Sequence, residues 1–378
     1  MEEKISNLFQ REDQSMIDSP GEWMEYRERW KEILMENLYG TFPREEGTAE
    51  GRISDSSLDY GGKAVRETIQ LCFGREKQVR LPAEILRPAG EGKHPVILWN
   101  RHSLDDICPV EEELVCGRGF VLASFVRGDL VEDAGDPENK SLSEAYPGYT
   151  WGRIAQWAFG MSRLLDYVSG QEYCDKKCVT ASGHSRGGKT AMCAAIYDER
   201  FTMCHANGSG CLGAGSLRIF GGHFGYGFGI CETITKIQEV FPYWWAPKLA
   251  AYTGEQESEM PADGHVLRAL IAPRPVITTE GCGDDWSNPY GTQIMWRAAQ
   301  EIYDFLECSD RNAIHYREGG HGFQRLDWCA LADFMEMQFK NKKIHTNLVS
   351  FRRPEESEEK CDWKWERPFY RWRAPQKE

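Results

Sequence analysis

The chain has 378 residues, of which 41% are hydrophobic and 28% are charged, and it contains 37 glycines. This composition describes a folded globular protein and excludes a disordered or fibrous chain. The formal net charge of −14 argues against a nucleic acid as partner, because phosphate binding depends on clustered lysine and arginine.

The sequence predicts neither a membrane span nor an export signal. The N-terminus lacks a basic stretch followed by an apolar one, and no run of about 18 apolar residues occurs. The thirteen cysteines show no zinc-ligand spacing, and an odd number does not suit a disulfide framework. We therefore expect reduced thiols, a cytoplasmic location, and neither a metal nor another cofactor.

The first 60 residues are expected to form a helical lead-in. Apolar residues from Trp23 to Leu38 recur at the three- and four-residue spacing of an amphipathic helix, and Gly40 is expected to end it. Residues 66–73 and 78–86 then alternate as strands do. We expect these two segments to pair antiparallel at the edge of a sheet.

Six short apolar runs follow, and each is typical of a strand buried on both faces. They cover residues 95–99, 120–126, 178–182, 202–206, 275–279 and 313–316. Helical patterns lie between them, most clearly at 154–168. This alternation predicts one α/β domain over 1–378, a three-layer αβα sandwich with a mostly parallel central sheet.

Two segments depart from this alternation. Residues 208–264 are rich in glycine and aromatic residues, and we expect them to form an insertion over the carboxyl-terminal edge of the sheet, where open α/β sheets bind ligands. Residues 353–378 combine an acidic run with several tryptophans. This aromatic tail is expected to pack along the body of the protein, with stacking on a sugar as the alternative.

The segment Gly-His-Ser-Arg-Gly at 183–187 follows a predicted strand and precedes a helical pattern. It matches G-x-S-x-G, the turn that exposes a nucleophilic serine, here Ser185, above an α/β-hydrolase sheet. Residues 183–190 also match the phosphate-binding loop of P-loop NTPases. Chain order favours the hydrolase, because several strands precede the motif and no downstream strand ends in a magnesium-binding aspartate.

A serine hydrolase of this fold needs an acid and then a histidine further along the chain. Asp284 and Asp285 follow the predicted strand 275–279, and His321 follows the strand 313–316. Either aspartate could orient the histidine. His315 lies inside the last predicted strand, so we interpret it as a core residue and choose His321 as the general base.

The chain resembles the glucuronoyl esterases, carbohydrate esterase family 15, and especially their bacterial members. The elbow of that family, G-x-S-R-x-G-K, is similar to Gly183 through Lys189. Further similar stretches are QWAFGMSRLLDY, NGSGC, CETITKIQEVFPYWW, DGHVLRALIAPRPV, the pair Asp284 and Trp286, the GGH that ends at His321, and the pair Asp327 and Trp328.

The resemblance implies a serine esterase that cleaves the ester between a (4-O-methyl-)glucuronate carboxyl and an alcohol of lignin, without a metal. It implies Ser185 as nucleophile, His321 as base, Asp284 as orienting acid and Arg186 as oxyanion stabiliser. Some members carry an acid just after the sixth strand, and the corresponding stretch here, HANGSG, has none.

The resemblance further implies that Lys189, Glu232 and Trp286 hold the hydroxyls and ring of the uronate. The expected partner is a small-molecule or oligosaccharide uronate ester, with no nucleic acid or membrane. A carbohydrate acetyl esterase or general carboxylesterase of the same fold is the alternative, since fold and triad do not fix the substrate. A second alternative is a carbohydrate-binding relative of the same fold that has no catalytic activity.

Overall fold

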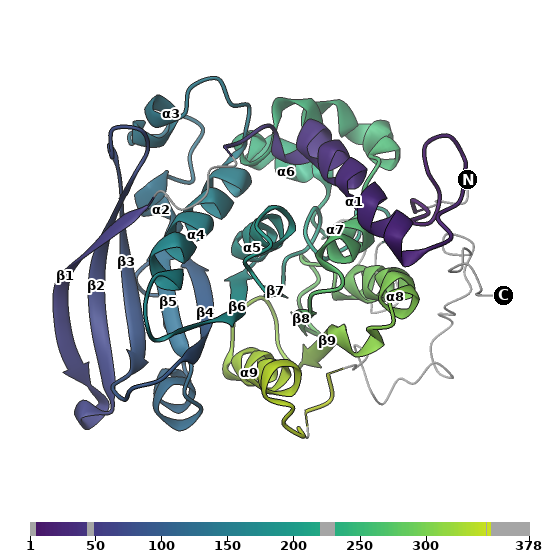
Figure 1. Ribbon diagram of the computed structural model, residues 1–378. Helices are drawn as coiled ribbons and strands as arrows, with labels where there is room; N and C mark the ends of the chain where they lie inside the picture. Colours follow the sequence, from purple (N-terminus) through teal and green to yellow (C-terminus); the bar gives the residue numbers. More distant parts are fainter. Residues whose placement is uncertain (1–4, 44–48, 220–230, 345, 349–378) are drawn as a thin grey trace.

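A mixed sheet of nine strands organises the computed structural model, which describes residues 5–43, 49–219, 231–344 and 346–348 (Figure 1). The strand order is β1-β2-β3-β5-β4-β6-β7-β8-β9. The pairs β1–β2, β2–β3 and β3–β5 are antiparallel, and the others are parallel. The strands are β1 (Glu50–Asp59), β2 (Ala64–Phe73), β3 (Val79–Pro88), β4 (His94–Arg101), β5 (Val121–Val126), β6 (Cys174–His184), β7 (Met203–Asn207), β8 (Val276–Gly281) and β9 (Asn312–Arg317).

The predicted strands are confirmed, because the six apolar runs coincide with β4 to β9 and the antiparallel pair is β2 with β3. The prediction of a helical lead-in over the first 60 residues is wrong in its last part. Residues 50–59 form β1, the outermost strand, and most of them are exposed. A strand with solvent on both faces has no reason to alternate apolar and polar residues, so its sequence carries no strand pattern.

The helices alternate with the strands from β5 onward. The helix expected from Trp23 to Leu38 is α1, which continues into the π-helical turn η1 and ends at Gly40 with φ 78°. The helical elements are α1 (Pro20–Leu34), η1 (Met35–Tyr39), η2 (Tyr60–Gly62), η3 (Glu113–Gly117), α2 (Arg127–Leu130), α3 (Ser141–Ala145), α4 (Arg153–Ser169), α5 (Arg186–Tyr197), α6 (Ile234–Val240), η4 (Pro242–Trp244), η5 (Pro247–Tyr252), η6 (Gly254–Glu259), α7 (Gly264–Ile271), α8 (Pro289–Phe305), η7 (Ser309–Arg311) and α9 (Arg325–Lys340).

Helices cover both faces of the sheet, as Figure 1 shows. On one face, α1, α4, α5 and α7 share a continuous apolar cluster with the side chains of β2 to β8. On the other face, α9 packs Trp328 and Leu331 against Ile97 and Leu122, which point away from the first cluster. The prediction of a three-layer αβα sandwich with a mostly parallel sheet is confirmed.

The segment between β7 and β8 breaks the alternation of strand and helix, as the sequence predicted. Its described parts contain α6, the short helices η4 to η6 and the start of α7, while 220–230 lie outside the described residues. The tail at 353–378 also lies outside them. Among the described helices, none combines the length and the apolar character that crossing a bilayer requires.

Candidate active site

Ser185 occupies a sharp turn between β6 and α5. Its backbone has φ 56° and ψ −124°, a conformation that residues other than glycine rarely adopt. Its N–H donates to the carbonyl of Asn207 at 2.8 Å. The strand therefore ends at His184, and the helix starts at Arg186. Such a strained strand-to-helix turn is the geometry that the G-x-S-x-G motif predicts.

Close packing explains the two glycines of the motif. A Cβ on Gly183 would lie 2.1 Å from the carbonyl oxygen of Gly187, and one on Gly187 would lie 2.6 Å from Oδ1 of Asn100. Asn100, at the end of β4, in turn donates to the carbonyls of Ser182 and Gly187. The first turn of α5 thus lies directly against β4 and β6.

Asp284 is the acid that contacts His321. Its Oδ2 lies 2.6 Å from Nδ1 of His321, and Oγ of Ser287 lies 3.1 Å from the same nitrogen. Asp284 is buried. Burial alone would raise the pKa of its carboxyl, but the hydrogen bond and charge of His321, together with Ser287, hold that pKa below its ordinary value. A proton on Nδ1 directed at Asp284 leaves Nε2 to act as a base.

Ser185 and His321 line the same cavity, which has a volume of about 290 Å³. The structure, which describes both residues, shows no hydrogen bond between their side chains, and the side chain of His321 is 36% exposed. Catalytic hydrogen bonds are often long before substrate binds. The lining residues are Trp99, Asn100, His102, Asp106, Arg127, His184, Ser185, Arg186 and His321.

Arg186 lies in the cavity wall beside Ser185, as its predicted role requires, but its guanidinium group is already engaged. It forms an ion pair with Asp133 and lies over the rings of Phe241 and Trp244, at 4.9 and 4.6 Å from their centroids. Trp244 also donates its Nε1–H to Asp133 at 2.7 Å. The charge of Arg186 is therefore largely compensated.

Lys189 and Glu232, both expected at the uronate, pair with each other. The Nζ of Lys189 lies 2.7 Å from Oε2 of Glu232 and 2.6 Å from the carbonyl oxygen of Ser209, and both side chains are buried. Neither residue lines the cavity that contains Ser185. This geometry also does not fit the P-loop interpretation, in which the lysine is available to phosphate.

Trp286 is exposed, with 40% of its surface accessible, and Nζ of Lys236 lies 5.8 Å from its ring centroid. Its carbonyl accepts a hydrogen bond from the N–H of Glu232, so it lies next to the buried ion pair. His315 lies in β9 as expected, and its Nδ1 lies 2.9 Å from the carbonyl oxygen of Asn347, but the side chain is half-buried and does not belong to the core.

Sequence reasoning missed His184, the residue between the glycine and the serine of the motif. Its ring lies 4.5 Å from that of His321, and its Nδ1 lies 2.6 Å from Oδ1 of Asn207. Burial and the neighbouring His321 lower the pKa of His184 to about 4, so it is neutral at neutral pH. The motif allows any residue at this position, so no sequence signal marked it.

Arg317 holds the loop that carries His321. Its Nε donates to Asp327 at 2.6 Å, and its terminal nitrogens donate to the carbonyls of Glu318, Gly320 and Gly322. Arg317 and Asp327 are both buried. Asp327 also accepts from the N–H of Gln324 and so caps α9. The end of β9, the histidine loop and the start of α9 are therefore joined by one guanidinium group.

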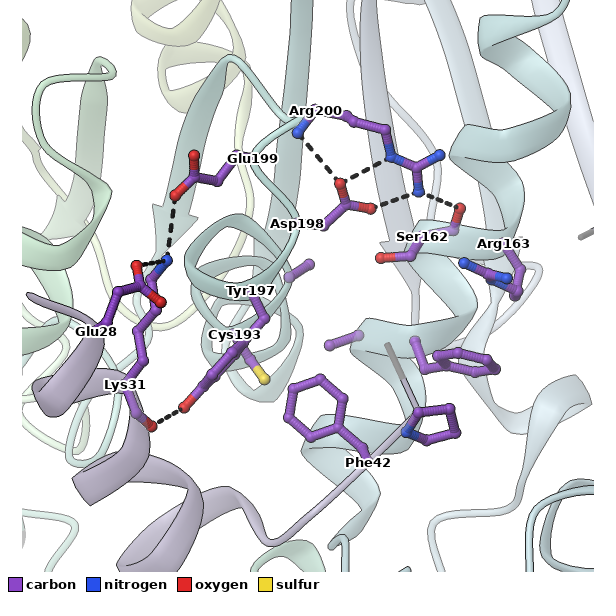
Figure 2. Close-up of a pocket in the computed structure, with 14 residues that line it drawn as sticks. Glu28, Lys31, Phe42, Ser162, Arg163, Cys193, Tyr197, Asp198, Glu199 and Arg200 are labelled. Atoms are coloured by element: carbon purple, nitrogen blue, oxygen red, sulfur yellow. Dashed lines mark hydrogen bonds and ion pairs between the residues drawn. The ribbon is translucent and has the colours of Figure 1, made fainter. Parts of the chain in front are cut away.

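A larger cavity, of about 510 Å³, lies among α1, α4 and the end of α5, and it contains neither Ser185 nor His321 (Figure 2). Most of its charged residues pair with one another. Lys31 lies 2.7 Å from Glu28 and 3.1 Å from Glu199, and Arg200 lies 2.7 Å from Asp198. No histidine is among the described residues that line this cavity, so it is not the candidate active site.

The sheet and the three side chains define a class of protein. Ser185 follows β6, Asp284 follows β8 and His321 follows β9, and the carboxyl ends of these parallel strands meet at one edge. This order and the nucleophile turn are those of the serine hydrolases with the α/β-hydrolase fold.

Comparison with known proteins narrows this class. The model of a family described as "Glucuronyl esterase, fungi" matches residues 72–307, more than half of the chain, so the protein belongs to the glucuronoyl esterase family. It is 28% identical to a carbohydrate esterase from an unknown prokaryotic organism, over 86% of this chain and 87% of that protein.

A fungal relative and a solved structure extend the comparison. The 4-O-methyl-glucuronoyl methylesterase of Podospora anserina is 24% identical over 84% of this chain and 63% of its own length. A carbohydrate esterase family 15 glucuronoyl esterase from Caldicellulosiruptor kristjansonii superposes with a TM-score of 0.78 at 23% identity, covering 93% of this chain and 95% of that chain. This structural likeness confirms the fold.

Proposed function

We propose that the protein hydrolyses esters of (4-O-methyl-)glucuronate by serine-dependent acyl transfer, with Ser185 as nucleophile, His321 as general base and Asp284 as orienting acid. The 2.6 Å contact between Asp284 and His321, with His321 and Ser185 in one cavity, carries this proposal. The name of the fungal relative, a 4-O-methyl-glucuronoyl methylesterase, supports the substrate class.

The mechanism follows from the positions of these three groups. His321 takes the proton of the Ser185 hydroxyl through Nε2 while Oγ attacks the ester carbonyl carbon, and Asp284 stabilises the imidazolium that forms. His321 then gives this proton to the departing alcohol. Water, activated by the same imidazole, attacks the uronoyl-serine ester and releases the acid.

The proposed roles of the remaining residues follow their positions. Arg186, which lines the cavity beside Ser185, and the backbone N–H at the start of α5 are proposed to stabilise the oxyanion. Trp286 offers an exposed ring to the sugar. Lys189 and Glu232 are proposed to stabilise the site as a buried ion pair. A direct contact of either residue with the uronate would require this ion pair to open.

The test compares the benzyl ester of glucuronic acid with an acetylated sugar. We expect the wild type to cleave the uronate ester with the higher kcat/KM, and Ser185→Ala to lose about 10⁴-fold or more of that rate. Ser169→Ala, which removes a half-buried hydroxyl at the end of α4, serves as the matched control and should retain full activity. Faster cleavage of the acetyl ester would instead identify a carbohydrate acetyl esterase.

A further inference from the structure

Arg127 places a buried positive charge in the catalytic cavity without a polar partner. It follows β5 as the first residue of α2, it is only 4% exposed, and it lines the cavity together with Ser185. Among the described residues, its guanidinium group has no hydrogen-bond or ion-pair partner, and it lies over the ring of Trp157, 5.4 Å from the ring centroid.

Other buried arginines of the described chain are compensated. Arg317 pairs with Asp327, Arg268 donates to Asn312 and Thr278, and Arg153 donates to two backbone carbonyls and Gln156. A buried charge without such partners costs several kcal/mol of folding free energy. A residue that breaks this rule in an active-site cavity marks a place where function outweighs stability.

Neither of the two carboxylates whose charge reaches Arg127, Asp133 and Asp106, forms an ion pair with it. Asp133 pairs with Arg186 and accepts from Trp244, and Asp106 accepts from the N–H of His102 at 2.6 Å. Burial and the charge of Arg186 lower the pKa of Arg127 to about 10. It remains a cation at neutral pH, so the cavity holds a positive charge that is free to meet an anion.

One distance places the guanidinium group of Arg127 beside the turn that carries Ser185. A Cβ built on Gly187 would lie 3.4 Å from Nη1 of Arg127, so the guanidinium group lies beside the first turn of α5, two residues after the nucleophile. Arg186, in contrast, is directed to Asp133 and to the rings of Phe241 and Trp244. Arg127 is therefore the less compensated of the two cations in the cavity wall.

We infer that Arg127 binds the negative charge that forms on the ester carbonyl oxygen, first as the oxyanion and then as the carboxylate of the released acid. When Oγ of Ser185 bonds to the carbonyl carbon, the π electrons move to the oxygen. Collapse re-forms the double bond and expels the alcohol, which takes the proton from His321. His321 then takes a proton from water as the water oxygen attacks the acyl carbon, and collapse of this second intermediate breaks the bond to Oγ of Ser185, which takes the proton from His321. The released acid loses its own proton to solvent and becomes the carboxylate. The identity of this acid as a uronate rests on the proposed function.

The test replaces Arg127 by methionine, which keeps the length and loses the charge. With p-nitrophenyl acetate and with benzyl glucuronate we expect kcat to fall about 100-fold, as for loss of an oxyanion donor, with a smaller change in KM. Inhibition by free glucuronate should weaken at least about 10-fold by the same reasoning. Arg127→Lys should recover part of the lost kcat and part of the lost inhibition by glucuronate.

Thermal stability separates this role from a structural one. Because Arg127 is a buried charge without a polar partner, Arg127→Met should raise Tm while activity falls. The control is Arg163→Met on α4, a buried arginine that pairs with Asp166 away from the cavity. Its loss should lower Tm and leave kcat unchanged.

Two outcomes would overturn the inference. One is unchanged kcat and unchanged glucuronate inhibition in Arg127→Met. The other is a fall in Tm like that of Arg163→Met accompanying the loss of activity, which would assign Arg127 a structural role. If the wild type cleaves p-nitrophenyl acetate and no uronate ester, the proposed function fails, and the acetate data alone decide the role of Arg127.

Discussion

Asp284 and Asp285 are adjacent in the sequence, and the turn after β8 directs only the first of them to His321. Asp284 is buried against the imidazole, whereas Asp285 is half-buried and is not among the partners of His321. Ser287 reinforces the same arrangement by contacting both Asp284 and Nδ1 of His321. One carboxylate therefore contacts the imidazole of His321, the proposed base, and favours a proton on Nδ1.

Asp284→Asn is expected to lower kcat by about 10³- to 10⁴-fold, because an amide cannot stabilise the imidazolium and can favour the wrong tautomer. The matched control is Asp285→Asn, which should keep kcat within about threefold, since this half-buried carboxylate is not a partner of His321. Steady-state hydrolysis of one ester by both variants provides the measurement. Equal losses would show that the choice of Asp284 is wrong.

The sequence was sufficient to predict that Ser185 and His321 share a site. Both follow buried strands of a parallel sheet, and such strands end at one edge. It could not choose between Asp284 and Asp285, nor reveal that Lys189 and Glu232 neutralise each other. These facts depend on side-chain directions that only the packed structure determines. Arg127 escaped notice for the same reason, because nothing in its sequence context shows that it lacks a partner.

At the scale of elements, the junction of β9 and α9 positions His321, the proposed general base. Arg317 leaves the strand, bonds to three carbonyls of the loop and pairs with Asp327 in the first turn of the helix. The planar guanidinium group can make these bonds at once, whereas an ammonium group cannot. The position of His321 is therefore set by a side chain that does not touch the cavity.

Arg317→Lys is expected to lower kcat about 10- to 100-fold with little change in KM, because a displacement of the base of about 1 Å has that cost. Arg325→Lys, which alters an exposed ion pair with Glu113 in the same region, is the control. Slower labelling of Ser185 by a phosphonate should accompany the loss in kcat. A lower Tm with unchanged kcat would mean that the loop keeps its position without the guanidinium group.

The elements themselves were predictable to different degrees. β4 to β9 were visible because helices cover both of their faces, so their sequences are continuously apolar. β1 was missed because its stability comes from backbone pairing with β2, which leaves no hydrophobic pattern. The insertion was recognised only by its departure from the alternation, and its internal helices carried no clear pattern.

At the scale of the whole molecule, buried histidines link stability to pH. His205 lies between β6 and β8, with its ring nitrogens 2.9 Å from Ser182 Oγ and 3.0 Å from Thr279 Oγ1. Burial lowers its pKa from 6.5 to about 3. The unfolded chain therefore takes up a proton below pH 6.5 that the folded chain refuses. This contribution to stability is complete above pH 6.5 and is lost as the pH falls toward 3.

His205→Gln is expected to be less stable than the wild type at pH 7, and this difference should shrink on acidification. Between pH 6 and pH 4 the free energy of unfolding of the wild type should fall more steeply, by about 1.4 kcal/mol per pH unit, because one more proton is taken up on unfolding. Urea denaturation at three pH values measures both slopes. Parallel slopes would show that His205 is protonated in the folded protein.

The irregular pairing of the outer strand, β1, affects whether the protein self-associates at high concentration. β1 pairs with β2 on one side, and its other side meets no strand of the described chain, while Ile53 and Leu58 are exposed. An open edge of this kind can recruit a strand from another molecule and start a fibril. The shift in pairing between Ile53 and Asp55, with the charges of Arg52 and Asp55, interrupts such a ladder. This irregularity thus guards the molecule against self-association through its most open edge.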